Sequence, residues 1–211
     1  MNQVNEIRHP LVKHLIGQLR EHNRRPEFFR PVVDKLSYLL CYEAVKDQAT
    51  VGENITTWAG STEVERLDDA AITVVPILRA GLGMLNGVMD LLPGASVSVV
   101  GFERDEDTLQ PHAYYEKWAP NVADKTALVI DPMLATGGTF LATVERLKAV
   151  GCESIHGLFL LAAPEGLEKL SAQHPDVHVT VAAVDERLNE LGYIIPGLGD
   201  AGDRIFNTVA E

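Results

Sequence analysis

The residues with the clearest chemical potential are one carboxylate and the loop of small residues that follows it. Asp131 comes directly after the short apolar run 126–130, and the loop ends where an amphipathic helix begins. The loop contains Ala135, Thr136, Gly137, Gly138 and Thr139. Small residues let backbone N–H groups approach a ligand, and the next helix adds unpaired donors at the positive end of its dipole. The pattern predicts a phosphate-binding loop with an acid that can bond sugar hydroxyls or order a metal, and therefore a phosphorylated sugar as ligand.

An ordinary strand-to-helix connection can also use a glycine pair, so Gly137 and Gly138 alone do not separate a structural turn from a ligand site. The order of strand, acid, small-residue loop and helix favours the ligand site. Two other phosphate-binding patterns do not apply: no Gly-Lys-Ser/Thr ending of a P-loop is present, and none of the strands expected below is followed by Gly-x-Gly-x-x-Gly.

One arginine, Arg79, has a sequence context that favours binding of an anionic group. Arg79 directly follows the apolar run 71–78 and precedes Ala80 and Gly81, a setting in which a structural arginine would be costly. This favours a functional role over a surface salt bridge, since fixed guanidinium groups pair bidentately with phosphate oxygens. Arg104 lies in a charged stretch that is, by itself, typical of a solvated loop.

The last irregular region is rich in glycine. Between Tyr193 and Arg204 the chain has three glycines, together with Pro196 and Asp200. Closely spaced glycines allow main-chain recognition of a ligand, but composition alone favours an ordinary surface loop here.

These groups must be positioned by regular elements on either side of them. Apolar residues at helical spacing predict a helix over 11–19 and a longer one that begins near Pro31, where proline suits the first turn. Strands are expected at 71–78, 96–102, 126–130, 155–161 and 177–184, and helices at 83–92, 141–150 and 165–173. The alternation predicts an α/β fold with a mostly parallel, twisted sheet flanked by helices, in a single domain over residues 1–211.

Residues 103–117 interrupt this alternation with a charged stretch, which we expect at the surface as a loop of the kind that forms lids. Trp58 and Trp118 are expected to pack inside the fold rather than to stack on a ligand. The seven histidines show no metal-ligand spacing, and we read them as surface or structural residues.

Composition narrows the class of protein further. With 211 residues, 46% of them hydrophobic, the chain can bury one substantial core. A formal net charge of -12 argues against nucleic acid or an anionic membrane as the main partner. Two distant cysteines, Cys41 and Cys152, indicate a reducing compartment without disulfides, and neither a signal peptide nor a membrane-spanning run is evident. A soluble cytoplasmic protein is expected.

Four stretches together resemble the uracil phosphoribosyltransferase family. Ile130–Gly138 resembles the motif for phosphoribosyl pyrophosphate (PRPP), and Tyr193–Arg204 resembles the uracil-binding segment; Pro76–Met84 and His9–Val12 agree as well. Asn207 departs from the family pattern, where glycine is expected. Pro132 stands where related phosphoribosyltransferases often have a second acid, so direct metal ligation by protein carboxylates is not expected here.

The resemblance implies the type I phosphoribosyltransferase fold, with a small C-terminal hood and N-terminal helices, and transfer of ribose 5-phosphate from PRPP to N1 of uracil. It implies that Arg79, Asp131 and Asp200 are catalytic. The PRPP site would contain Arg79, Arg104, Asp131, Pro132, Met133, Leu134, Ala135, Thr136, Gly137, Gly138, Thr139 and Asp200. Uracil would be bound by Ile194, Gly199, Asp200 and Ala201.

The resemblance also implies Mg²⁺, held mainly by PRPP and water, a homo-oligomer of two or more copies, and in some members a response to GTP. Three alternatives remain open from the sequence: a phosphoribosyltransferase for another base, a regulator on the same fold that binds RNA or a repressor, and an inactive paralogue. The acidic net charge disfavours RNA. The presence of Arg79, Asp131 and Asp200 disfavours the inactive paralogue.

Overall fold

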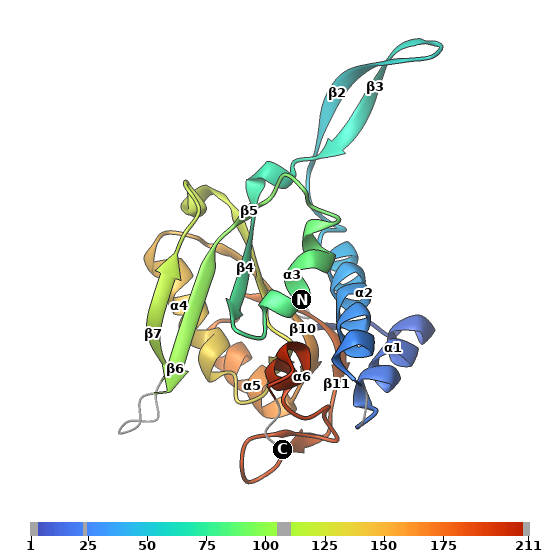
Figure 1. The fold of residues 1–211 in the computed structure, drawn as a ribbon. Helices are drawn as coiled ribbons and strands as arrows, with labels where there is room; N and C mark the ends of the chain where they lie inside the picture. Colours follow the sequence, from blue (N-terminus) through green and yellow to red (C-terminus); the bar gives the residue numbers. More distant parts are fainter. Residues whose placement is uncertain (1–3, 23–24, 105–110, 209–211) are drawn as a thin grey trace.

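The computed structural model describes residues 4–22, 25–104 and 111–208 of the chain (Figure 1). Its centre is a nine-stranded sheet made of β1 (Val4–Glu6), β4 (Ile72–Leu78), β5 (Ser96–Val97), β6 (Val99–Arg104), β7 (Pro111–Lys117), β8 (Thr126–Ile130), β9 (Met133–Leu134), β10 (Ser154–Ala162) and β11 (His178–Val184). The main path has the order β1-β11-β10-β8-β4-β6-β7, with β5 paired to β4 and β9 paired to β10. Every described pair in this sheet is parallel except β6–β7, which confirms the predicted α/β fold class.

Helices cover both faces of the sheet. One layer contains α1 (Pro10–Arg20), α2 (Pro26–Ala44) and α3 (Leu82–Met89), and the other contains α4 (Gly138–Ala149) and α5 (Pro164–Gln173). Successive strand residues point to opposite faces: Val74 and Leu128 join the core under the first layer, whereas Val75 and Val129 join the core under the second. Because both faces are covered, β4 and β8 are apolar along nearly their whole length, which is what made them recognisable in the sequence.

The predicted start of the second helix was wrong. Helix α2 begins at Pro26, and Pro31 lies inside it rather than in its first turn. Proline at position 31 removes one helical N–H donor, but Phe29, Val33 and Leu36 from the same stretch are completely buried. Burial of this apolar face offsets the missing hydrogen bond and keeps the helix continuous.

The expected surface loop at 103–117 is largely a strand. Residues 111–117 form β7, which pairs antiparallel with β6 at the edge of the sheet. Gly101 leaves room there for the ring of Tyr114, which occupies the space that a side chain on residue 101 would need. The lid predicted near Arg104 falls on residues 105–110, which lie outside the described residues.

A hairpin that the sequence analysis did not predict projects from the end of the body opposite α6 (Ala201–Phe206) (Figure 1). It consists of β2 (Thr50–Thr57) and β3 (Gly60–Leu67), whose register leaves Trp58 and Ala59 as the two turn residues. Trp58 is 100% exposed at the tip, so the expectation that it packs inside the fold was wrong. Trp118 does pack against the core, as expected.

Two further strands, β12 (Arg187–Leu188) and β13 (Ile194–Ile195), form a small antiparallel sheet in the C-terminal region. Together with α6 they cover the end of the main sheet at which β4 terminates (Figure 1). In the parts of the chain that the structure describes, no helix is long and apolar enough to cross a membrane.

Candidate active site

The candidate site begins where β4 and β8 end side by side. These strands are parallel neighbours, with Pro76 opposite Ile130. The chain leaves β4 through α3 toward β6 on one side, and leaves β8 through α4 toward β10 on the other. A reversal of this kind opens a crevice at the carboxyl ends of the two strands, the usual ligand position in open α/β sheets. Arg79 follows β4 and Asp131 follows β8, so the fold brings these two predicted residues to the same edge.

The loop after Asp131 has the geometry of a phosphate-binding turn. Gly137 has a left-handed backbone, with φ of 77°, and precedes the first residue of α4, Gly138. The N-cap residue Gly137 has no side chain to cap this helix, and the first N–H groups have no carbonyl partner one turn earlier. Gly166 of α5 packs so closely that a Cβ there would lie 2.3 Å from the carbonyl oxygen of Ala135. The turn is therefore held by backbone contact, with its amide donors available.

The C-terminal segment around Gly199 and Asp200 carries main-chain N–H donors and C=O acceptors near this loop. Gly199 has φ of 80°, and the Asp200 carboxylate caps α6 by accepting a hydrogen bond from the backbone N of Asp203 at 2.9 Å. Ala201 is the first residue of α6. Gly197, Gly199 and Gly202 have the Gly-x-Gly-x-x-Gly spacing, but the strand before them, β13, has two residues and an antiparallel partner. The βαβ unit of a dinucleotide-binding motif is therefore missing here.

One cavity of about 270 Å³ joins the two motifs. From the first motif it is lined by Asp131, Met133 and Ala135, and from the second by Ile194, Gly199, Asp200 and Ala201. The lining also includes Ala80, Gly192, Tyr193 and Gly202, which we did not predict as site residues. Ala80 and Tyr193 lie inside the stretches that resembled the family, so their place in those motifs was the available signal.

Burial changes the acidity of the Asp131 carboxyl. Desolvation is the main cause and raises its pKa to about 7; the nearby charge of Asp200 acts in the same direction, while a hydrogen bond from the backbone N of Met133 acts against both. The distance from that nitrogen to Asp131 Oδ1 is 3.3 Å. An acid whose protonation changes near neutral pH inside a cavity is typical of a functional site.

Arg79 occupies a different environment from the one that its sequence context indicated. Its side chain is 60% exposed rather than buried, because β4 ends at Leu78. Arg79 Nη2 lies 3.4 Å from Asp203 Oδ1, and the guanidinium lies 5.9 Å from the centre of the Phe206 ring. Both partners belong to α6, so Arg79 lies beside the segment that carries Asp200, with most of its side chain exposed. Arg104 ends β6, and its side chain lies outside the described part of the structure.

Other residues predicted for the PRPP site differ in their access to a ligand. Pro132 and Leu134 are buried. Their carbonyl oxygens accept hydrogen bonds from Leu160, Leu161 and Ala163, so they fix the loop to the end of β10. Thr136 is exposed, and its Oγ1 accepts a long bond of 3.5 Å from the N of Gly138. Thr139 lies in the first turn of α4.

Solved structures share this architecture. Adenine phosphoribosyl transferase from Trypanosoma brucei, in complex with AMP, pyrophosphate and ribose-5-phosphate, matches with a TM-score of 0.57 at 12% identity, over 91% of this chain and 88% of that one. A purine phosphoribosyltransferase from Pyrococcus horikoshii matches with a TM-score of 0.50 at 16% identity, over 73% and 83% of the two chains. The fold is that of the type I phosphoribosyltransferases.

A closer likeness covers almost the whole chain. The AQ2163 protein from Aquifex aeolicus has 39% identity and a TM-score of 0.92, over 99% of this chain and 100% of that one. The model of the family described as "Uracil phosphoribosyltransferase" matches residues 6–208. The chain belongs to this family. Family and fold together make it a phosphoribosyltransferase, an enzyme that transfers a pentosyl group.

Proposed function

We propose that this phosphoribosyltransferase acts on uracil, transferring ribose 5-phosphate from PRPP to give UMP and diphosphate. The bond between ribose C1 and the diphosphate oxygen breaks, C1 bonds N1 of uracil, and N1 loses its proton. The observation that carries the proposal is the cavity lined jointly by the loop after β8 and the segment before α6. A sugar phosphate and a base must meet within one site, and these are the two segments that resemble the family's motifs for each.

In this proposal the 5′-phosphate binds the backbone amides of Ala135–Thr139. Left-handed Gly137 and the uncapped start of α4 favour an anion at this position, and the hydroxyls of Thr136 and Thr139 add donors. Asp131, at the mouth of the loop, accepts hydrogen bonds from the ribose 2′- and 3′-hydroxyls. Its ionised form is the one that can accept both.

Diphosphate gains negative charge as the C1–O bond breaks, and we assign Arg79 and Arg104 to it. The exposed side chain of Arg79 makes a long contact of 3.4 Å with Asp203, which a phosphate oxygen can replace. Charge-assisted pairs with phosphate are strong and directional, and they stabilise a transition state more than a ground state when the charge is still growing.

Mg²⁺ would bind where the diphosphate binds. Within the described residues no group of three or more metal-ligating side chains lies together, and the acids that line the cavity are Asp131 and Asp200. This set suits Mg²⁺, which keeps several waters and takes oxygen ligands from substrate phosphates. When bound, the ion would neutralise part of the charge on diphosphate. Asp131 and Asp200 would hold its waters in place.

The base edge of uracil reads acceptor, donor, acceptor, and we assign its recognition to main-chain groups of Ile194, Gly199 and Ala201. Cytosine presents a different pattern at two of these positions. Each buried mismatch costs about 1–3 kcal/mol, so two of them give strong discrimination. Asp200 lies beside these groups and is the candidate acceptor of the N1 proton; near-normal turnover by Asp200→Asn would remove it from that role.

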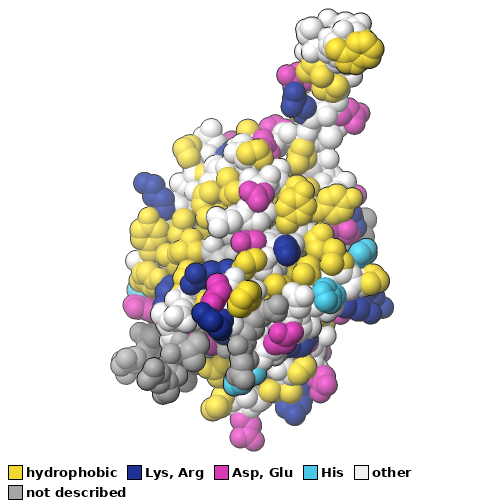
Figure 2. All heavy atoms as spheres, turned by 45° about the vertical axis from the view of Figure 1, so that its right-hand side comes forward, with side chains coloured by type: hydrophobic (Ala, Val, Ile, Leu, Met, Phe, Trp, Pro, Cys, Tyr) yellow, Lys and Arg dark blue, Asp and Glu magenta, His cyan; other side chains and the backbone are white. Residues whose placement is uncertain are grey.

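Three further parts of the proposal concern the whole protein. Residues 1–211 act as one domain, two or more copies associate, and the enzyme works in the cytoplasm, where its buried thiols Cys41 and Cys152 stay reduced. Figure 2 shows hydrophobic side chains at the tip of the hairpin and over the face that carries α1 and α2, and we assign self-association to these two surfaces. Repeating the assay below with added GTP tests the effector that the family resemblance implies.

The direct test supplies uracil and PRPP with Mg²⁺ and measures UMP and diphosphate. Adenine, hypoxanthine, guanine and cytosine are supplied in parallel. Formation of UMP with little reaction of the other bases supports the proposal, and efficient use of a purine in place of uracil would overturn it.

A further inference from the structure

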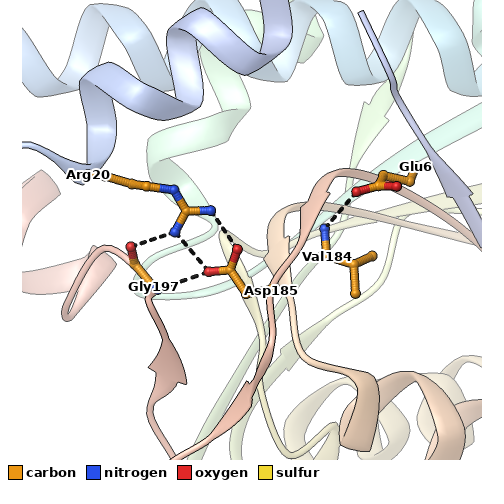
Figure 3. Close-up of polar contacts among 5 residues, drawn as sticks. All are labelled: Glu6, Arg20, Val184, Asp185 and Gly197. Atoms are coloured by element: carbon orange, nitrogen blue, oxygen red, sulfur yellow. Dashed lines mark hydrogen bonds and ion pairs between the residues drawn. The ribbon is translucent and has the colours of Figure 1, made fainter.

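The loop that precedes α6 is tied to a distant part of the fold by one arginine and one aspartate (Figure 3). Arg20 Nη2 donates to Asp185 Oδ1 at 2.5 Å, and Arg20 Nη1 donates to Asp185 Oδ2 at 2.8 Å. The same Nη1 donates to the carbonyl oxygen of Gly197 at 2.8 Å, and the N–H of Gly197 donates to Asp185 Oδ2 at 2.9 Å. The four bonds form a closed network in which both main-chain groups of Gly197 are used.

The network is anchored in rigid elements. Arg20 is the last residue of α1, and Asp185 directly follows β11, where its N–H donates to the carbonyl oxygen of Ala162. Glu6 of β1 holds the same strand end by accepting a bond from the N–H of Val184 (Figure 3). The Asp185 side chain is 4% exposed and that of Arg20 is 26% exposed, so water screens the pair little. Gly197 is thereby fixed to the sheet and to α1.

The loop needs such an anchor because it has open space on both sides. Gly199 and Asp200 line the candidate active site and also a second cavity of about 350 Å³, which Arg20, His22 and Arg204 border on the other side. Buried Leu198 gives this loop one point of attachment, since its side chain packs in the core and its carbonyl oxygen accepts a hydrogen bond from Arg204 Nη1 at 2.8 Å. Arg20 and Asp185 give it a second one at Gly197, which lies in the base-binding stretch between Ile194 and Gly199.

We propose that Arg20 and Asp185 are positioning residues for base selection: they lie outside the catalytic cavity and hold Gly197 so that the neighbouring main-chain groups meet the base in register. This rests on the proposed function. Recognition through the main chain needs donors and acceptors placed within a fraction of an ångström, so a shift of this loop weakens binding of the base. The same shift leaves the phosphate-binding loop in place, because α4 and α5 hold that loop independently.

Two variants separate this role from general stability. Asp185→Asn keeps the side-chain shape but turns one acceptor oxygen into an NH₂ donor, which then opposes Arg20 or the N–H of Gly197. Arg20→Lys keeps the charge but cannot bridge both carboxylate oxygens and a carbonyl with one planar fork. Arg66→Lys is the matched control, since its ion pair with Glu53 lies on the hairpin, at the opposite end of the molecule.

The measurements are kcat, the KM for uracil, the KM for PRPP, and PRPP affinity by calorimetry. We expect Asp185→Asn and Arg20→Lys to raise the KM for uracil about tenfold or more and to narrow the preference for uracil over cytosine, while PRPP affinity stays within about twofold. Arg66→Lys should leave all four unchanged. The double variant should be no worse than the poorer single one, because both changes break the same network.

An unchanged KM for uracil in both variants would overturn the inference. So would a parallel loss of uracil and PRPP binding, which would mean that the network only supports the fold. Failure of the proposed function looks different, because the unmodified enzyme then makes no UMP. If it accepts another base, the same comparison is made with the KM for that base, and if it accepts none, the inference falls with the function.

Discussion

Asp131 follows a buried strand and precedes a loop of small residues, and it lines a cavity in which desolvation raises the pKa of its carboxyl to about 7. A group with that pKa is mostly protonated below pH 7, and a protonated carboxyl is a poorer acceptor for two ribose hydroxyls. The affinity for PRPP should therefore decrease as the pH falls through 7.

Between pH 8 and pH 6 the ionised fraction of a carboxyl with this pKa falls about tenfold, and we expect PRPP affinity to fall by a similar factor. PRPP phosphates also titrate near pH 6, so the comparison is the affinity ratio of the unmodified enzyme to Asp131→Asn, measured by calorimetry at each pH. The ratio should decrease toward acid pH. A ratio that stays constant from pH 8 to pH 6 would contradict the prediction that PRPP binding follows the ionisation of Asp131 near pH 7.

The local structure around a candidate residue could be predicted where it depends on neighbouring residues. Asp131 and Gly137 lie in one motif and Gly199 in another, and the strand or turn at each can be read from the residues beside it. The environment of Arg79 could not be predicted in this way. The apolar residues before it indicated burial, yet its side chain is exposed because the strand ends one residue earlier. The pair Arg20 and Asp185 has no sequence signal, since 165 positions separate its members.

At the scale of elements, the position of Arg79 depends on how α3 packs, because α3 begins three residues later. Gly87 lets α3 approach α2 closely: a Cβ at position 87 would lie 2.2 Å from the carbonyl oxygen of Asp34 and 2.9 Å from the Cβ of Ser37. Backbone atoms cannot yield as a flexible side chain can, so any larger residue must push the two helices apart.

We expect Gly87→Ala to lower the free energy of unfolding by about 1–3 kcal/mol. The matched control is Gly17→Ala, also inside a helix, where a Cβ would meet no atom within 4 Å. Alanine should stabilise that exposed position by up to about 1 kcal/mol. Denaturant unfolding at one protein concentration measures both. Equal effects at the two positions would contradict the packing argument.

The elements that could be predicted are those with continuous burial. Strand β8 was predicted with its observed bounds because it is apolar between a lysine and an aspartate. Hairpin β2–β3 was missed because it lies away from the body and is mostly polar, so neither face shows the period of a buried strand. Strand β7 was missed because it is itself at the edge of the sheet, where charged residues are tolerated.

At the scale of the whole molecule, the strand order explains why the site forms where it does, and that order could not be read from the sequence. The chain gives no local sign that β4 and β8 are neighbours, or that their connections leave in opposite directions.

The hairpin is a second feature of the whole molecule. It places a fully exposed tryptophan far from the body, a costly surface unless another copy covers it.

The proposed self-association predicts a sedimenting mass at least twice the chain's 23.0 kDa. Trp58→Ser should weaken the association, measured as a higher dissociation constant by sedimentation equilibrium. Leu191→Ser is the control, because Leu191 is also highly exposed but lies in the C-terminal region. A protein that stays monomeric at every concentration, or one that responds equally to both substitutions, would contradict this assignment of the hairpin.

We propose that the cavity lined by Asp131 and Ala201 is where PRPP reacts with uracil. This is tested by measuring UMP and diphosphate formed from uracil and PRPP in the presence of Mg²⁺, with the product identified by mass. We expect equal amounts of the two products, and their loss in Asp131→Asn and Arg79→Ala. Release of diphosphate without UMP, or no reaction of uracil while another base is converted, would contradict it.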